Sequence, residues 1–291
     1  MDDPAPGTRI GKYRVIGTLG RGGMGGVHEV EDETGARFAL KAPMQDIEGL
    51  DINRRFAREA NVLRLLDHPN LVAAVDVFSE AGRLYLVMEK VAGETLASAL
   101  DFGPLDPRRA VVLMRQTLAG VSHAHAQGLI HRDLKPENIL LVDMGGWERV
   151  KIIDFGTVKL LGDVAAAFGA EALTRTGLVF GTPRYMAPEQ ALGRLVDQRS
   201  DLYALGVILF EMLIGRAPFE AKDPVAMLKA HVKTPPPPLR EASGGAPWCT
   251  PQLAMLVEIA LAKSPDHRFP SAAHMTAALD DAFRSLEAVW P

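Results

Sequence analysis

Apolar and polar residues alternate in short runs through the first third of the chain, a pattern that is typical of strands. Turn residues such as Glu33, Thr34 and Gly35 separate two of the runs. Residues 51–66 differ, because they carry apolar side chains at the spacing of a helical face with basic residues between them. The pattern therefore predicts one helix and five strands, with the strands at residues 13–19, 26–30, 37–41, 72–78 and 83–88.

The rest of the chain has the apolar spacing of helices. Pro107 suits a first helical turn, and Gly128 stops the helix that follows it. Residues 202–214 are apolar on nearly every face apart from Glu211, so they predict a buried helix that is too short for a membrane span. The predicted helices cover residues 107–127, 202–214, 224–231, 252–262 and 271–286.

This order of elements predicts an α+β fold with two lobes. The strand-rich part and the helical part meet near residues 87–94, and a cleft between two lobes is where a ligand is expected. Residues 235–238 are a run of four prolines, which we interpret as a stiff connector between helices. The alternative is a ligand for the aromatic groove of a partner protein.

The composition is that of a globular protein, with 47% hydrophobic and 23% charged residues in a chain of 291. A net charge of -4 and a pI near 6.1 argue against a nucleic-acid-binding surface. Cys249 is the only cysteine, so no internal disulfide can form, and we interpret it as a small semi-buried side chain in a reducing compartment. The first residues lack the basic and apolar regions of a signal peptide, so a cytoplasmic location without a membrane segment is expected.

Residues 131–138 read HRDLKPEN and place three different chemical groups on one tight loop. Asp133 offers a carboxylate, Lys135 a cation and Asn138 an amide. Sixteen positions after Asn138, a second carboxylate, Asp154, begins the sequence Asp-Phe-Gly directly after an apolar run. A base, a phosphate-binding cation and two oxygen ligands for Mg²⁺ are the parts that phosphoryl transfer from a nucleotide requires.

Residues 20–27 read GRGGMGGV, with Gly20, Gly22 and Gly25 in a regular pattern. Glycine lets backbone amides approach phosphate oxygens without a Cβ in the way. The pattern alone is weak, because a flexible hairpin would also fit it and a dinucleotide fold is a rival. That rival needs the glycines to lead into a helix, whereas here they lead into a predicted strand. The sequence therefore favours a strand–loop–strand lid over ATP.

Lys41 ends the predicted strand at residues 37–41, and alternation points it to the same face as Ala39. A lysine at the end of an apolar strand is ordinarily a solvated charge. Its place after the glycine loop also suits a contact with the α- and β-phosphates of a nucleotide. Such a lysine needs an anionic partner; Glu59 in the predicted helix is the expected one, and Glu48 in a predicted loop is its rival.

With these motifs in this order, the chain resembles the eukaryotic-like protein kinase family, and within it the bacterial Ser/Thr protein kinases. The match spans about residues 10–283, with an N-lobe of about 10–90, a C-lobe of about 91–283 and tails at 1–9 and 284–291. The resemblance implies a small antiparallel-sheet N-lobe with one main helix and a larger helical C-lobe. Besides the motifs above, it rests on Ala-Pro-Glu at residues 187–189, on residues 201–206 and on Arg268.

The resemblance implies a catalytic set and an ATP site. Asp133 would orient the substrate hydroxyl and accept its proton, with Lys135, Lys41 and Glu59 as the other catalytic residues. Met88 would be the gatekeeper beside adenine. The residues expected to contact ATP are Leu19, Gly20, Gly22, Gly25, Val27, Ala39, Lys41, Met88, Glu89, Val91 and Leu140.

The resemblance also implies metal ligands and structural contacts. Asn138 and Asp154 would hold Mg²⁺, with Mn²⁺ as the alternative metal. Glu189 would pair with Arg268 and fix the substrate platform, and Asp201 would accept hydrogen bonds from the backbone of the catalytic loop.

Protein serine and threonine are the acceptors that the resemblance implies, and Thr182 would lie in the substrate-docking loop at residues 181–185. Thr174 and Thr176 are expected autophosphorylation sites, for which a homodimer would allow transfer in trans. Arg132 would bind one of these phosphates, although a simple surface ion pair with a carboxylate would also explain an arginine there.

Two features depart from the family pattern or carry no assigned chemistry. The glycine loop is followed by Gly26 and His28, and we interpret His28 as a surface residue of a strand. His123, His125 and His231 have no metal-ligand partners at suitable spacing and are interpreted as structural.

Two other functions stay open at this point. A pseudokinase scaffold would lack Lys41, Asp133 or Asp154, and none of these is missing. A small-molecule kinase would not need the peptide-docking segment at residues 181–189.

Overall fold

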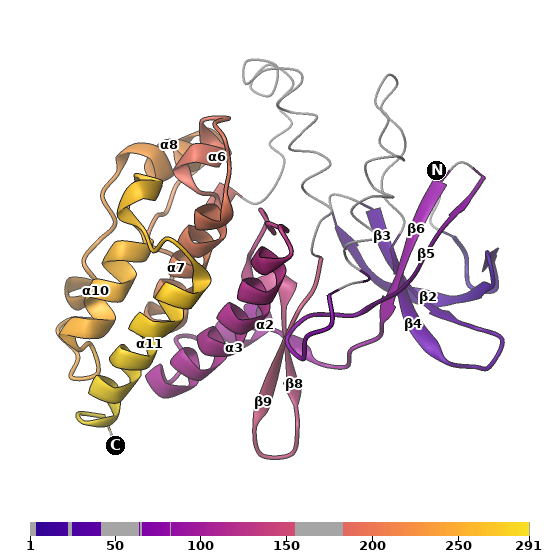
Figure 1. Ribbon diagram of the computed structural model, residues 1–291, viewed down its shortest axis with the longest axis horizontal. Coiled ribbons are helices and arrows are strands. Elements are labelled where there is room, and N and C mark those ends of the chain that lie inside the picture. Colours follow the sequence, from indigo (N-terminus) through magenta and orange to yellow (C-terminus); the bar gives the residue numbers. More distant parts are fainter. Residues whose placement is uncertain are drawn as a thin grey trace. The chain divides into compact units, whose positions relative to one another are not determined.

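A computed structural model describes residues 4–22, 25–41, 64, 66–81, 83–154 and 183–290 of the chain. The chain divides into two compact units, Met1–Ala92 and Gly93–Pro291. The first unit contains a sheet and the second is mainly helical (Figure 1). The predicted α+β fold is therefore confirmed.

Six antiparallel strands form one sheet in the first unit, in the order β1-β2-β3-β4-β6-β5. All five predicted strands are present, and the predicted helix at residues 51–66 falls almost wholly outside the described residues. The strands are β1 (Arg9–Ile10), β2 (Tyr13–Gly22), β3 (Gly25–Glu31), β4 (Arg37–Lys41), β5 (Ala74–Glu80) and β6 (Arg83–Glu89).

Aromatic side chains form much of the core of this sheet. Tyr13 stacks on Phe78 at a centroid distance of 5.9 Å, and Phe78 stacks on Tyr85 at 5.4 Å. The backbone of Gly11 (φ +58°) passes so close that an added Cβ would lie 2.7 Å from the Phe78 ring. Only glycine combines this positive φ with that approach, so the aromatic core determines the residue type at position 11.

His28 is buried, with 1% of its surface exposed, so its interpretation as a surface residue was wrong. It lies in the middle of β3, opposite Thr18 of β2 and Leu40 of β4. Because β3 has a strand on each side, the position is more enclosed than the polar residue type suggests. Sequence alternation alone does not tell which strands are central.

The second unit combines helices with a small sheet of order β7-β8-β9 (Figure 1). Its strands are β7 (Glu94–Thr95), β8 (Ile139–Asp143) and β9 (Glu148–Ile152). The helices are α2 (Leu96–Leu100), α3 (Pro107–Ala126), α6 (Pro188–Ala191), α7 (Gln198–Ile214), α8 (Pro224–Lys233), α9 (Leu239–Ala242), α10 (Pro251–Ala260) and α11 (Ala272–Glu287). Short 3-10 turns are η1 (Pro136–Asn138), η2 (Pro183–Tyr185) and η3 (Pro265–His267).

Helix α7 is the centre of this unit, and every residue from Ser200 to Leu213 is buried. Asp197 caps its first turn by accepting from the Arg199 amide, and Gly215 ends it with φ +81°. Gly206 lies so close to α10 that an added Cβ would be 2.7 Å from the Ala260 Cβ. The prediction of a buried core helix is confirmed, and no helix among the described residues has the length and apolar character that crossing a membrane requires.

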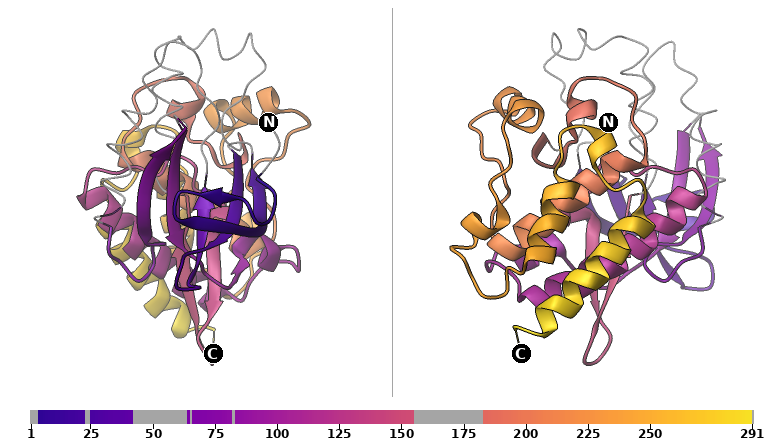
Figure 2. Two further views of the ribbon diagram at one scale, coloured as in Figure 1. Left: turned by 90° about the vertical axis from the view of Figure 1, so that its right-hand side faces the viewer. Right: turned by 60° about the vertical axis from the view of Figure 1, so that its left-hand side comes forward.

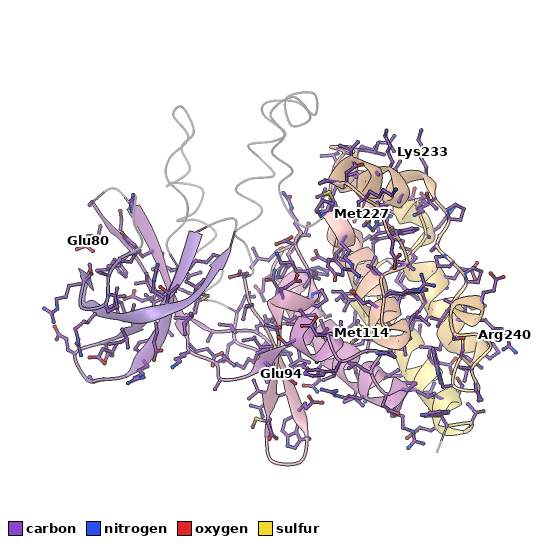
Figure 3. All side chains as sticks on the ribbon, turned by 180° about the vertical axis from the view of Figure 1, so that it is seen from behind. Glu80, Glu94, Met114, Met227, Lys233 and Arg240 are labelled. Atoms are coloured by element: carbon purple, nitrogen blue, oxygen red, sulfur yellow. The ribbon has the colours of Figure 1, made fainter. Side chains whose placement is uncertain are left out.

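Helices α3, α10 and α11 pack around the same interior. Asp106 caps α3 by accepting from the amides of Arg108 and Arg109. Helix α11 runs beside α3 (Figure 2), and Arg115 pairs with Asp280 between them at 3.1 Å. Figure 3 shows Met114 among the helices, where its side chain is fully buried.

Two smaller expectations can be compared with the structure. The four prolines at residues 235–238 connect α8 to α9, which confirms their interpretation as a connector between helices. Cys249 is fully buried rather than semi-buried, and burial raises the pKa of its thiol.

Candidate functional site

The glycine-rich segment of the first unit lies in a hairpin of β2 and β3. Gly20 is opposite Val27, and Gly22 is opposite Gly25, so the glycines lead from strand to strand and not into a helix. An added Cβ on Gly20 would meet no atom within 4 Å. This topology removes the dinucleotide fold as a rival and leaves space beside Gly20 for a ligand.

Strand pairing arranges the other expected nucleotide-binding residues of this unit. Lys41 is opposite Val27, and Ala39 is opposite Met88. Lys41 is only 5% exposed, which is unusual for a lysine at a strand end. The remaining expected residues of the unit are less buried: Val27, Ala39, Glu89 and Val91 are half-buried, and Leu19 is exposed. Glu59, the expected partner of Lys41, lies outside the described residues.

Asp133 and Lys135 come together on the loop before η1. The Lys135 Nζ lies 3.3 Å from the Asp133 Oδ2, and both side chains are partly exposed. The Asp133 amide donates to His131 Nδ1 at 3.3 Å, so His131 must carry its proton on Nε2, which donates to the Ile153 carbonyl at 3.1 Å. His131 therefore ties the Asp133 loop to the segment that leads into Asp154.

Asp201 at the start of α7 holds the same loop through its backbone. Its carboxylate accepts from the amides of His131 and Arg132, both at 2.8 Å, and from His125 Nε2 at 2.8 Å. Burial alone would raise the pKa of the Asp201 carboxyl, but the His125 hydrogen bond and the nearby donors hold that pKa below its usual value. Arg132 has φ +66°, a conformation that costs energy for a residue with a Cβ. The two amide contacts to Asp201 therefore stabilise a strained turn directly before Asp133.

Asn138 and Asp154 lie at the same end of the β8–β9 hairpin. Ile139 pairs with Ile152, so Asn138 just before β8 and Asp154 two residues after β9 lie near each other. The Ile153 amide donates to the Asn138 carbonyl at 2.9 Å, which joins the two segments directly. Asp154 is a second residue at positive φ, with φ +65°.

The chemistry of this pair suits a hard divalent cation. The Asn138 Nδ2 donates to the Asp133 carbonyl at 2.9 Å, so the amide oxygen is the atom that remains for a metal. In the described parts of the chain, no three His, Cys, Asp or Glu side chains gather as a metal cage. Mg²⁺ typically binds to one or two protein oxygens and to substrate phosphates, so one carboxylate and one amide oxygen fit it. Leu140, expected beside adenine, is half-buried on β8.

Glu189 and Arg268 form a buried ion pair with two parallel hydrogen bonds. Nη1 lies 2.7 Å from Oε1 and Nη2 lies 2.8 Å from Oε2, and the exposed fractions of the two side chains are 0% for Arg268 and 6% for Glu189. The other three Arg268 N–H groups donate to carbonyls of residues 199, 262 and 263. Burial would raise the pKa of the Glu189 carboxyl, but Arg268 and Ser200 hold that pKa below its usual value. All five guanidinium donors are therefore satisfied, as a buried charge requires.

Arg268→Ala is expected to lower the free energy of unfolding by about 3–5 kcal/mol, because it leaves the Glu189 charge buried and without its counter-ion. Urea unfolding of the parent and the variant would measure the difference. Arg284→Ala is the matched control, since Arg284 pairs with Asp281 at the surface and both side chains are mostly exposed. A loss for Arg268→Ala no larger than that for the control would contradict the assignment.

Several residues that brace the site were not found from the sequence. Gln190 of α6 donates to the Arg132 carbonyl at 2.8 Å and accepts from the Ala187 amide at 3.0 Å, so it links the Ala-Pro-Glu segment to the catalytic loop. Glu211 accepts from the Tyr185 hydroxyl at 2.7 Å and from Arg184 at 3.0 Å. Arg132 lies 58 positions from Gln190 and Tyr185 lies 26 positions from Glu211, so no local pattern indicated these two contacts.

Three expected site residues, Thr174, Thr176 and Thr182, lie outside the described residues, as does the whole segment between Asp154 and Pro183. Arg132, the expected phosphate-binding residue, is described and belongs to the catalytic loop.

These features define a class of protein. One unit carries a glycine hairpin and a buried strand lysine, and the other carries an aspartate–lysine loop beside an asparagine–aspartate pair on a β-hairpin. Fold and site together are those of the protein kinases.

Comparison with known proteins agrees with this class. The family described as Protein kinase domain matches residues 13–280, so the chain belongs to the protein kinase family. Serine/threonine-protein kinase Pkn1 of Myxococcus xanthus is 41% identical over 95% of the chain, and PrkC of Bacillus subtilis is 37% identical over 95%. Serine/threonine-protein kinase PknA of Mycobacterium tuberculosis is 39% identical over 91%. The match covers only 39%, 41% and 59% of the lengths of these three relatives.

A solved structure with the same fold is the kinase domain of Mycobacterium tuberculosis PknI. Its TM-score is 0.74 at 25% identity, and the match covers 96% of this chain and 100% of that one. The family match and the match to a solved structure therefore agree on a protein kinase fold.

Proposed function

We propose that this chain is the catalytic domain of a Ser/Thr protein kinase, which transfers the ATP γ-phosphate to serine or threonine hydroxyls of proteins. The observation that carries the proposal is the loop of Asp133 and Lys135, braced by Asp201, with Asn138 and Asp154 at the adjacent hairpin end. The names of the curated relatives support serine and threonine as acceptors.

The chemistry follows from the roles of these groups. A bond forms between the acceptor oxygen and the γ-phosphorus, the bond from that phosphorus to the β-phosphate bridging oxygen breaks, and ADP leaves. The Asp133 carboxylate aligns the acceptor hydroxyl and takes its proton. Lys135, whose Nζ lies 3.3 Å from the Asp133 carboxylate, stabilises the charge of the transferring phosphate in this scheme. Lys41, at the end of β4, binds the α- and β-phosphates of ATP.

We propose Mg²⁺ as the metal, held by the Asn138 amide oxygen and the Asp154 carboxylate. A bound divalent ion supplies neutralisation of the phosphate charge during transfer. Mn²⁺, which also accepts oxygen ligands, is the alternative at the same residues.

One assay distinguishes the proposed protein kinase from a pseudokinase and from a small-molecule kinase. The chain is incubated with ATP, Mg²⁺ and myelin basic protein, and phosphate on serine and threonine of the acceptor is measured by mass spectrometry. A pseudokinase would bind ATP but transfer no phosphate. A small-molecule kinase would consume ATP in a metabolite mixture but leave the protein acceptor unmodified. Either result would overturn the proposal.

Autophosphorylation of Thr174 and Thr176 is the regulation we propose, with Arg132 binding one of the phosphates. A phosphothreonine carries nearly two negative charges and three acceptor oxygens, which suit an arginine. Thr174→Ala combined with Thr176→Ala is expected to lower activity toward a protein acceptor without changing the fold. Intact mass and peptide mapping after ATP treatment measure the phosphates, and a rate per molecule that rises with concentration indicates transfer between two copies.

Arg132→Ala tests the partner of the phosphate. It should lower activity, and adding it to the double threonine variant should lower activity little further, since the three residues act through one contact. Absence of phosphate on residues 174 and 176, or full activity of the double variant, would refute this regulation.

A further inference from the structure

His231 of α8 uses both ring nitrogens in a fully buried position that the catalytic scheme above does not involve. Nε2 lies 2.9 Å from the Arg184 carbonyl of η2, and Nδ1 lies 2.9 Å from the Tyr203 hydroxyl of α7. The ring packs edge-on against Phe219 at a centroid distance of 4.9 Å. One side chain therefore joins two helices to a short turn that lies in the segment expected to dock the substrate.

The direction of both hydrogen bonds follows from the acceptor. A carbonyl oxygen can only accept, so His231 Nε2 carries a proton and donates it to Arg184. Burial, together with the nearby Lys263 ammonium, lowers the pKa of His231 to about 4. The ring is then neutral at physiological pH, Nδ1 has a lone pair, and the Tyr203 hydroxyl donates to it. The Arg184 carbonyl therefore fixes the tautomer, and the Tyr203 hydroxyl bonds the other nitrogen and helps to orient the ring.

The contact is part of a network of buried and part-buried side chains around η2. The Arg268 guanidinium carbon lies 4.8 Å from the centre of the Tyr203 ring, so the buried Glu189–Arg268 pair supports the tyrosine that orients His231. Turn η2 has a second attachment, because Glu211 accepts from Tyr185 and Arg184. Helix α8 also packs against η2 and α6, and Figure 3 shows its residues Met227 and Lys233 at one edge of the unit.

The Glu211 contacts hold η2 by its side chains, whereas His231 holds its backbone. The Arg184 side chain is partly exposed. The Arg184 backbone carbonyl is the atom that accepts from the buried His231 ring. Without His231, the Arg184 carbonyl would lose its donor, and η2 would lose the contact that joins its backbone to α8.

We propose that His231 is a positioning residue for the protein substrate, because its Nε2–H fixes the backbone of η2 within the docking segment. This inference rests on the proposed kinase function for its kinetic consequence but not for its structural one. His231 touches neither ATP nor the reacting atoms, so its loss should weaken binding of the protein acceptor and leave ATP binding unchanged.

His231→Phe removes both hydrogen bonds and keeps a ring of similar size. Its KM for myelin basic protein is expected to rise about five- to tenfold, since the part-buried Arg184 carbonyl loses its donor. The KM for ATP should stay unchanged, and amide exchange of a peptide spanning residues 183–187 should become faster. His231→Gln places an amide donor near the Nε2 position and should restore both readouts toward the parent. His274→Phe, at an exposed histidine of α11, is the matched control and should behave as the parent.

The possible outcomes separate this proposal from the kinase proposal. If the parent transfers no phosphate, the kinase function fails, but the exchange comparison still tests the role of His231. If His231→Phe matches His274→Phe in exchange, or raises both KM values equally, the positioning role is overturned. If His231→Phe does not fold, as circular dichroism would show, His231→Asn decides, because its shorter amide cannot reach the Nε2 position: faster exchange and a raised acceptor KM support the role, and parent-like values overturn it.

Discussion

Asp133→Asn is expected to lower the rate of phosphoryl transfer about 10²- to 10⁴-fold, the usual contribution of a positioned general acid–base group. Asparagine is nearly the same size, and the backbone contacts of the loop to Asp201 and Asn138 do not involve the Asp133 side chain. The loop should therefore keep its conformation, and ATP affinity should be nearly unchanged because the proposed partner of Asp133 is the acceptor and not the nucleotide.

Single-turnover transfer to myelin basic protein measures the loss, and calorimetric titration with ATP and Mg²⁺ measures the binding. Asp143→Asn is the matched control, because Asp143 is an exposed aspartate at the end of β8, next to the hairpin turn. If Asp133→Asn keeps more than about a tenth of the parent rate, Asp133 is not the group that takes the proton of the acceptor hydroxyl. A variant that loses ATP binding as well would indicate a collapsed loop, which the two amide contacts to Asp201 argue against.

The sequence predicted most of the fold because its signals are local. Residues 202–214 were predicted as a buried helix because they are apolar on nearly every face, and the structure has α7 over Gln198–Ile214, with the same end and an earlier start. The β4 strand was predicted at its observed bounds, since the turn at residues 33–35 separates it from β3. Helix α2 was missed, because five residues are too few to show a helical period.

Contacts between distant residues had no such signal. His231 and His28 are buried and the His125 side chain is only 4% exposed. His125 and His231 received the same interpretation because neither had a neighbour at metal-ligand spacing. Their partners, Asp201 for His125 and Arg184 with Tyr203 for His231, lie 76, 47 and 28 positions away. Only the fold decides whether a buried histidine braces a catalytic loop or fixes a turn.

The sequence predicted the metal-site residues next to the β8–β9 hairpin but not the strand pairing that brings them together. The sequence motifs indicated Asn138 and Asp154 separately, and the resemblance assigned them to one metal. Pairing of Ile139 with Ile152 gives the physical reason, because an antiparallel hairpin brings the residue before one strand next to the residues after the other. Sixteen positions of separation therefore become a short distance in space, and the metal assignment gains a structural argument.

Asp154→Ala is expected to abolish Mg²⁺-dependent binding of ATP, because it removes the only carboxylate of the proposed metal pair. The amide oxygen of Asn138 alone is a neutral ligand and does not compensate for the lost charge. The remaining affinity for ATP should no longer respond to Mg²⁺, since the glycine hairpin and Lys41 would contact the phosphates without the metal.

Calorimetric titration of ATP at several Mg²⁺ concentrations measures this dependence directly. Asp143→Ala is the control on the same hairpin, at the opposite end of β8, and its Mg²⁺ dependence should match the parent. Thermal unfolding in the absence of nucleotide separates metal loss from misfolding, because Asp154 at φ +65° occupies a conformation that alanine adopts only with strain. Asp154→Asn therefore belongs in the same series: asparagine tolerates this φ better than alanine and retains an oxygen, but it lacks the charge. Mg²⁺ dependence that survives in both variants at parental strength would remove Asp154 from the metal site.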